Sequence, residues 1–360
     1  MLDQDSIYKG YLMHSFPNPF RHAETTIQMP LLIPAPSVDA VTPTALLARC
    51  PAAKITPLID AASLAKVAGV GSVYVKDERA RMGLGSFKAL GAAYVIAHDA
   101  AAIGGDDLSN VLTGRTYVSA SAGNHGLSVA AGARVFGAKA VIYLAQAVPE
   151  SFAIRLRDMG ADVVRSGTDY AQSMTAAMND GEANGWSLLS DTSWDDYFEV
   201  PHRLMEGYCV LMDEVFNQIP AAPTHILLQA GVGGLAGAAA AMARAQWGDA
   251  PQIIVIEPEL APALMESAKA GHCVLTNGPT SEMGRLDCKE PSLIALKGLA
   301  SDADLFTTIS EQEAQASMPI LAAHDLACST SGGAGLAALL SGLNLPSNAR
   351  VLAVLSEGVS

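Results

Sequence analysis

Residues 83–91 read GLGSFKALG, which predicts a turn that leads directly into a helix. Ser86 is a typical N-cap residue, and Phe87 and Leu90 follow at helical spacing. Lys88 then falls in the first helical turn, where the positive end of the helix dipole disfavours a charged ammonium group. A lysine that is kept neutral can act as a base or form a Schiff base. Taken alone, the stretch fits a solvated lysine on an ordinary helix better, so other motifs must decide.

Around this stretch, short apolar runs alternate with Ala-rich segments of helical spacing. The expected strands are residues 73–76, 116–119, 140–144, 161–165, 225–228, 253–257 and 351–355. Such an alternation predicts an α/β fold with parallel sheets covered on both faces. Residues 271–300 are richer in Gly, Pro and charge, and we expect a long functional loop with a short helix there.

A second motif, SASAGNHG at residues 119–126, follows a predicted strand and opens the next helix. Its small residues leave backbone N–H groups available for an anion such as a substrate carboxylate. The candidate substrate-binding residues are Ser121, Ala122, Gly123 and His125. Asn124 can donate a hydrogen bond to a ring oxygen. Without Lys88, plain strand-to-helix capping explains the motif equally well.

The third motif, QAGVGGLAG at residues 229–237, again lies between a strand and a helix. Consecutive glycines let backbone amides approach a phosphate at a helix N-terminus. Residues 231–236 also satisfy the dinucleotide pattern GxGxxA, and Glu257 closes the next strand about where an acceptor for a ribose hydroxyl would fall. Taken in isolation, this segment leaves an NAD-dependent oxidoreductase open.

In this order the three motifs resemble the pyridoxal-phosphate (PLP) enzymes of fold type II, which include the serine/threonine dehydratases. Further stretches are similar to the diaminopropionate ammonia-lyases within that group. These stretches are residues 75–79 leading to 83–88, 191–197 with Pro201, Gly207 and Tyr208, residues 223–225 with 228–233, the pair Glu257-Pro258, and residues 331–336.

The resemblance implies a fold like that of the tryptophan synthase β chain. It has two open, twisted, mostly parallel sheets covered by helices, with the cofactor in the cleft between the lobes. We expect a large cofactor-binding domain from residues 1–110 and 195–360, and a small mobile domain from residues 111–194. The resemblance also implies a homodimer.

Several cofactor-binding residues are implied in the same way. Lys88 would form the Schiff base with PLP and remove the substrate α-proton, while Phe87 would pack against the pyridine ring. Asn124 would bond the phenolate oxygen, and Ser356 would face the pyridine nitrogen. The phosphate would be held by the loop residues Gly231, Val232, Gly233, Gly234 and Leu235. A serine cannot protonate the ring nitrogen as a carboxylate does, which favours β-elimination over transamination.

Two acidic positions of the lyases bear on the reaction. Asp191 aligns with the one near the β-amino leaving group, where a carboxylate could hold or protonate a departing amine; a capping role in a turn is as good an interpretation. Ala122 replaces the acidic residue that precedes Gly-Asn-His-Gly in the lyases. Because alanine cannot move a proton, we expect turnover of one α-configuration, the L form, with Lys88 as the sole base. Residues 284–288 differ from the lyases, so the substrate is left open.

The amino-acid composition limits the classes of molecule that the protein is expected to bind. The formal net charge is −14, so nucleic acid or an anionic membrane surface would repel the chain. The eight histidines form no HxH or HExxH pair, so no metal site is expected. Asp3 and Asp5 stand where a signal peptide needs positive charge, and the five cysteines form no CxxC pair; both features indicate a cytoplasmic protein.

Three hypotheses follow. The first is a PLP-dependent β-eliminating lyase that acts on an L-amino acid such as L-2,3-diaminopropionate, with L-serine and L-threonine as alternatives. The second is the NAD-dependent oxidoreductase. The third is a PLP-binding protein without catalytic activity.

Overall fold

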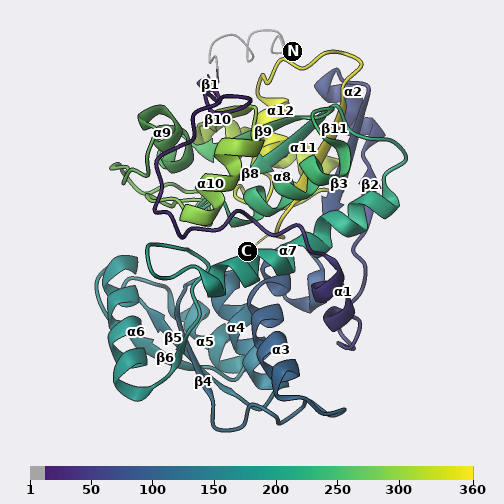
Figure 1. Cartoon of the computed structure of the whole chain (residues 1–360). Coiled ribbons are helices and arrows are strands. Elements are labelled where there is room, and N and C mark those ends of the chain that lie inside the picture. Colours follow the sequence, from purple (N-terminus) through teal and green to yellow (C-terminus); the bar gives the residue numbers. More distant parts are fainter. Residues whose placement is uncertain (1–12, 360) are drawn as a thin grey trace. The chain divides into compact units, whose positions relative to one another are not determined.

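The computed structural model of the chain describes residues 13–359. The chain folds into two compact units, each with its own parallel sheet (Figure 1). Unit 1 comprises residues up to Pro36, Thr56–Arg79 and the chain from Glu214 onward; unit 2 comprises Ser37–Ile55 and Ala80–Asp213. Residues 80–110 and 195–213 therefore fold together with the predicted small domain 111–194, because the elements that follow Ala80 pack on its helix α4 (Asn124–Val135). The proposed mobility of residues 111–194 stays a prediction.

Unit 1 contains a seven-stranded sheet in which five parallel strands are flanked by an antiparallel strand at each edge. In sheet order the strands are β1 (Ser15–Pro17), β10 (Leu305–Ile309), β9 (Gln252–Pro258), β8 (His225–Gln229), β11 (Arg350–Leu355), β3 (Ser72–Asp77) and β2 (Leu58–Asp60). Its helices are α2 (Ala62–Ala68), α8 (Gly234–Trp247), α9 (Ala263–Ala270), α10 (Leu293–Asp302), α11 (Glu311–Ala323) and α12 (Ala334–Leu340).

The sheet of unit 1 is buried by helices, as its near-continuous apolar strands require. Side chains from β3, β8, β9 and β11 form one core with α2, α11 and α12. Helices α8 and α10 pack on each other, and α8 contacts β8. Residues 271–300, expected to be a long loop with a short helix, include the first eight residues of the ten-residue helix α10.

Unit 2 contains a four-stranded, all-parallel sheet with the order β6-β5-β4-β7. Its strands are β4 (Thr116–Ala120), β5 (Lys139–Leu144), β6 (Asp162–Arg165) and β7 (Ser187–Leu188). Its helices are α1 (Val41–Leu47), α3 (Ala92–Ile103), α4, α5 (Glu150–Asp158) and α6 (Tyr170–Asn184), together with the 3-10 turns η2 (Arg81–Gly83) and η3 (Phe87–Leu90). The long helix α7 (Glu199–Gln218) begins in unit 2 and ends in unit 1.

The strand order places the predicted motifs at sheet edges where loops converge. In unit 2, β4 and β7 are parallel neighbours, so residues 121–126 and 189–191 leave the sheet at the same carboxyl edge. In unit 1, β8 and β11 are parallel neighbours, so the glycine motif and Ser356 leave at one edge as well. Both are points where the strand order reverses, and open α/β sheets bind ligands at such points.

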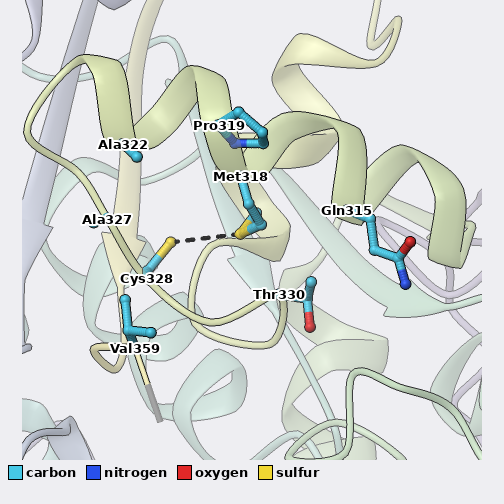
Figure 2. A pocket seen from close by; sticks show the side chains of 8 residues that line it. All are labelled: Gln315, Met318, Pro319, Ala322, Ala327, Cys328, Thr330 and Val359. Carbon is cyan, nitrogen blue, oxygen red and sulfur yellow. Dashed lines mark hydrogen bonds between the residues drawn. The ribbon is translucent and has the colours of Figure 1, made fainter.

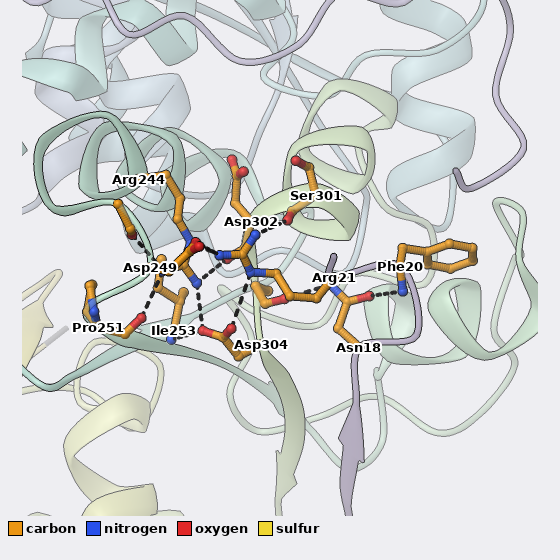
Figure 3. Close-up of polar contacts among 12 residues, drawn as sticks. Asn18, Phe20, Arg21, Arg244, Asp249, Pro251, Ile253, Ser301, Asp302 and Asp304 are labelled. Carbon is orange, nitrogen blue, oxygen red and sulfur yellow. Dashed lines mark hydrogen bonds and ion pairs between the residues drawn. The ribbon is translucent and has the colours of Figure 1, made fainter. Parts of the chain in front are cut away.

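The N-terminal part of unit 1 is held by a cluster of polar contacts (Figure 3). The side-chain amide of Asn18 donates to the carbonyls of Leu299 (3.1 Å), Ala300 (2.9 Å) and Ala303 (2.6 Å) at the end of α10. Nearby, Asp304 accepts from both Arg21 (3.3 Å) and Arg244 (2.6 Å). These contacts fix β1 against β10 and so cover that edge of the sheet.

Candidate active site

Lys88 lies in a short 3-10 turn, and not in the first turn of the continuous helix that the stretch GLGSFKALG predicts, which the sequence pattern extends over residues 87–98. The turn η3 ends at Gly91, and α3 begins at Ala92. The hydroxyl of Ser86 accepts a hydrogen bond from the backbone N–H of Lys88 (3.3 Å), so the predicted N-cap is confirmed. Lys88 therefore precedes the long helix α3 and does not belong to its first turn.

The backbone segment that precedes Lys88 contains several residues with positive φ. Met82, Gly83 and Gly85 have φ of 50°, 72° and 81°, which is the left-handed region. Glycine adopts this region freely, whereas a residue such as Met82 pays about 1–2 kcal/mol. The two glycines of the motif are thus needed to form the turn that presents the lysine.

The amine of Lys88 is paired with Asp191. The distance from Nζ to Oδ2 is 2.5 Å, and the two side chains are 22% and 18% exposed. The amine also lies 5.2 Å from the centre of the Phe87 ring. Burial alone would raise the pKa of Asp191, but the positive charge of Lys88 and the hydrogen bond from Lys88 lower it well below its usual range. Asp191 is therefore a carboxylate at any pH near neutral.

His125 is a buried, neutral histidine at the start of α4. Its Nε2 lies 3.0 Å from the carbonyl oxygen of Leu189, which can only accept, so Nε2 carries the proton. Burial lowers the pKa of His125, and so does the charge of Lys88. This contact ties the Asn124 loop to the segment that carries Asp191, because both follow neighbouring strands.

The remaining residues of this loop are arranged around Ser121. Its hydroxyl accepts hydrogen bonds from the backbone N–H groups of Gly123 (3.2 Å) and Gly126 (3.1 Å). A side chain at Gly126 would place its Cβ 2.8 Å from the carbonyl oxygen of Ser121, so only glycine fits there. Asn124 is the first residue of α4; the N-cap residue Gly123 has no side chain, and the Ser121 hydroxyl takes the amide of Gly126 in the first turn. The substrate-binding role of Ser121, Ala122, Gly123 and His125 stays a prediction.

Sequence reasoning assigned no role to Tyr208, which the structure places beside Lys88. This residue of α7 is 1% exposed, and its ring contacts Phe87 edge-on with a centroid distance of 4.9 Å. A Cβ at Gly91 would lie only 2.7 Å from its ring, so Gly91 leaves the space that the ring occupies. The sequence does contain glycines at positions 91 and 207. That they allow α7 to pack closely on η3 can be seen only in the structure.

In unit 1, the glycine motif forms a tight turn at the start of α8. A Cβ at Gly231 would lie 2.9 Å from Sγ of Cys288 and 3.1 Å from the backbone of Leu286, and Gly233 has φ of 95°. Among the described residues no side chain caps α8, and its first backbone bond runs from the N–H of Gly237 to the carbonyl of Gly233 (2.8 Å). The amides of Gly234, Leu235 and Ala236 precede that bond and form a site for an anion.

Ser356 follows β11 at the same edge of the sheet. It is 5% exposed, and its N–H donates to the carbonyl of Gly332 (3.1 Å). Gly332 must be glycine, because its Cβ would lie 2.5 Å from the carbonyl oxygen of Glu357. Glu357 is itself buried, accepts from the hydroxyl of Ser329 and lies 3.8 Å from Nε of Arg285.

Glu257 does not serve as an acceptor for a ribose. Both of its carboxylate oxygens accept backbone N–H groups at the start of α9, from Leu264 (2.7 Å) and Met265 (2.8 Å), and the side chain is fully buried. The acidic residue that made the NAD interpretation attractive is therefore a helix cap.

A separate cavity of about 450 Å³ in unit 1 is lined mainly by apolar side chains of α11 and the segment that follows it (Figure 2). Met318, Pro319, Ala322 and Cys328 form much of its wall. Burial raises the pKa of Cys328 to about 12, so its thiol is no nucleophile at neutral pH. None of the predicted site residues lines this cavity. No helix within residues 13–359 combines the length and apolarity that a bilayer crossing needs, and no cluster of three metal-ligating side chains occurs there.

Comparison with known proteins decides between the remaining interpretations. Residues 50–357 match the family described as "Pyridoxal-phosphate dependent enzyme". The chain belongs to this family. A diaminopropionate ammonia-lyase of Salmonella typhimurium is 32% identical over 297 residues, which cover 76% of this chain and 73% of the relative.

Two further similarities are more distant. An L-threonine ammonia-lyase of Thermotoga maritima is 26% identical over 304 residues, which cover 84% of this chain and 71% of the relative. The crystal structure of diaminopropionate ammonia lyase from Escherichia coli in complex with D-serine has a TM-score of 0.85 at 26% identity, covering 96% of this chain and 94% of the other. The predicted family, fold class and cofactor are thereby confirmed.

The residues of this family member fit PLP by their own chemistry. The uncapped start of α8 suits a phosphate dianion, and the absence of Cβ atoms lets it approach the backbone. The hydroxyl of Ser356 can donate a hydrogen bond to a ring nitrogen. In unit 2, the amine of Lys88 is positioned by Asp191 and by the Phe87 ring.

Proposed function

We propose that the chain is a PLP-dependent lyase that eliminates the β-amino group of L-2,3-diaminopropionate. With one water molecule, the products are a 2-keto acid and two molecules of ammonia. The pair formed by Lys88 and Asp191 at 2.5 Å carries this proposal, together with the relatives named diaminopropionate ammonia-lyase.

Different residues of the chain have different roles in this reaction. Lys88 would hold the cofactor at its aldehyde carbon, and its amine, once the amino group of the substrate has displaced it there, would take the α-proton. Gly231–Leu235 would hold the phosphate, Asn124 would donate to the phenolate oxygen, and Ser356 would donate to the ring nitrogen. Bound PLP supplies electron withdrawal from the α-carbon, which makes the α-C–H bond acidic.

The charge of Asp191 favours an amine as the leaving group. A β-ammonium leaves as neutral ammonia and needs no acid, whereas the hydroxide of serine or threonine must be protonated as it departs. The lowered pKa of Asp191 keeps this group ionised, so it can hold an ammonium but has no proton to donate. L-Serine and L-threonine remain alternative substrates, and the similarity to an L-threonine ammonia-lyase supports them.

Supplying PLP to the purified protein and following absorbance and product release tests this proposal. We expect a band near about 410–420 nm from lysine-bound PLP, and release of ammonia and keto acid from L-2,3-diaminopropionate faster than from L-serine or L-threonine. Lys88→Ala removes the amine and should abolish both signals, whereas Lys139→Ala, which changes a lysine at the start of β5, should leave both intact. A protein that takes up no PLP, or that turns over none of the three amino acids, would refute the proposal.

We further propose that the enzyme is a cytoplasmic homodimer that binds a small amino acid and no nucleic acid or membrane. The acidic composition and the resemblance support this assignment. Light scattering of the purified protein at micromolar concentration gives its mass directly; a value near 37.2 kDa would contradict the dimer.

A further inference from the structure

The hydroxyl of Tyr208 has no part in the reaction as described, yet it is buried without a hydrogen-bond partner among residues 13–359. A buried polar group of this kind is uncommon, because it loses its bond to water and gains none in return. The phenylalanine side chain would fill the same space without this penalty. An unpartnered hydroxyl beside a reactive lysine therefore calls for a function.

The ring of Tyr208 is placed precisely. Its edge-to-face contact with Phe87, at 4.9 Å between centroids, holds it next to the residue that precedes Lys88. Two glycines make the approach possible: a Cβ at Gly91 would lie 2.7 Å from the Tyr208 ring, and one at Gly207 would lie 2.2 Å from the carbonyl oxygen of Leu90. Helix α7 thus packs directly on the turn that carries the lysine.

The hydroxyl is within electrostatic reach of the Lys88–Asp191 pair. Burial raises the pKa of Tyr208 above its ordinary value and the charge of Asp191 raises it too, whereas the charge of Lys88 and a hydrogen bond with Lys88 lower it in part. The phenol is therefore protonated at neutral pH and keeps its proton as a donor. The ammonium form of Lys88 has no lone pair, so it cannot accept that proton.

The other titratable groups near the pair have no spare hydrogen-bond donor for the amine; Nδ1 of His125 lacks a partner but carries no proton in this tautomer. Tyr197 donates its hydroxyl to the carbonyl of Leu188 and accepts the N–H of Ser190, both at 3.0 Å. His125 donates from Nε2 to Leu189 and is neutral. Asp191 accepts from Lys88 and stabilises its charged form.

We propose that Tyr208 is a positioning residue that donates a hydrogen bond to Nζ of Lys88 when this amine is neutral. The neutral amine has a lone pair, and that lone pair takes the α-proton in the proposed reaction. Asp191 and Tyr208 then act in opposite directions: the carboxylate stabilises the ammonium and the phenol stabilises the free base. The inference rests on the proposed function, because only there does Lys88 act as a base.

Tyr208→Phe tests the inference, since it removes the hydroxyl and keeps the ring. Without the donor, the neutral amine is less stable and Lys88 loses its proton only at higher pH. We expect the acid limb of the pH profile of kcat for L-2,3-diaminopropionate to move up by on the order of one pH unit, the size of one hydrogen bond. PLP affinity, measured by titration of the cofactor absorbance, should stay within about threefold of wild type, because the phenol bonds no part of the phosphate site.

Tyr117→Phe is the matched control. Tyr117 is equally buried in unit 2, but its hydroxyl already donates to Asp99 (2.8 Å). This variant should lose thermal stability and keep the wild-type pH profile, while Tyr208→Phe should keep or gain stability because the hydroxyl that it loses is unpartnered. A pH profile of Tyr208→Phe that superimposes on wild type would overturn the inference alone. A wild-type protein that binds no PLP or releases no ammonia would overturn the proposed function instead.

Discussion

At the scale of single residues, the proposed reaction depends on a lysine whose surroundings are set by three side chains. Asp191 follows β7, Tyr208 belongs to α7 and Phe87 precedes the lysine itself. Each acts differently on the amine: by charge, by an available donor and by an apolar wall. Replacing any one of them should change the lysine in its own way.

Asp191→Asn removes the negative charge and keeps the shape. The neutral amide holds a β-ammonium weakly and no longer pairs with Lys88, so kcat/KM for L-2,3-diaminopropionate should fall by roughly 10²–10⁴. PLP binding should persist. Asp180→Asn, which changes an acidic residue that binds Tyr143 elsewhere in unit 2, serves as the control and should be close to wild type. Unchanged kinetics of Asp191→Asn would show that the carboxylate has no role in the reaction.

Ala122 should restrict the enzyme to one enantiomer. An alanine side chain neither accepts nor donates a proton, so no base at this position serves the opposite face of the substrate. We expect L-2,3-diaminopropionate to be turned over at least about 100-fold faster than the D form, a factor at the lower end of what one catalytic base contributes. Ammonia release from the two enantiomers, measured under identical conditions, decides the matter, and similar rates would mean that another group serves as the second base.

At the scale of elements, the site is formed where helices begin. Helix α8 begins with uncapped amides, whereas α9 begins on the buried carboxylate of Glu257. The second helix supports the first: a Cβ at Gly233 would lie 3.1 Å from the Leu264 side chain, so the start of α9 packs beneath the glycine turn. The cap on α9 thus contributes to the shape of the phosphate site.

Glu257 should make stability depend on pH. Burial raises its pKa from 4.5 to about 8, and the two backbone donors lower it less. A group whose pKa is raised on folding stabilises the fold below pH 4.5, and this contribution is lost as the pH rises towards about 8, at up to roughly 1.4 kcal/mol per pH unit.

Urea denaturation of wild type and Glu257→Gln at pH 5, 6.5 and 8 measures this effect. Glutamine does not titrate, so the free energy of unfolding of wild type relative to the variant should decrease steadily over this range. A difference that stays constant with pH would show that the carboxyl group has the same pKa in the folded and the unfolded chain.

At the scale of the whole molecule, PLP should act as a structural ligand. A ligand that binds only the folded state adds about 2.7 kcal/mol at a concentration 100 times its Kd. The melting temperature should therefore rise with PLP concentration. Pyridoxal, which lacks the phosphate, should raise the melting temperature much less, because it offers no hydrogen-bond acceptor to the backbone amides at the start of α8. Equal stabilisation by both compounds would contradict the assignment of the glycine loop.

The sequence predicted much of the framework. All seven predicted strands overlap strands of the structure, because central parallel strands are buried on both faces and read as continuous apolar runs. The short strands β1, β2 and β7 were missed, since two or three residues carry no period. The strand β10 was missed too, and the helix predicted over 87–98 is interrupted at Gly91, where packing of Tyr208 overrides local helical spacing.

The amino-acid sequence by itself determined the family, the cofactor and the candidate residues Lys88, Asn124 and Gly231–Leu235, because each motif is local and its chemistry depends on a few neighbouring residues. Only the tertiary structure decided that Lys88 pairs with Asp191, that Tyr208 lies beside it and that Glu257 caps a helix. These contacts join positions far apart in the chain, which meet because parallel strands bring their carboxyl ends to one edge and because glycines let helices approach closely. Neither strand order nor close helix packing produces a residue spacing that can be recognised in the sequence.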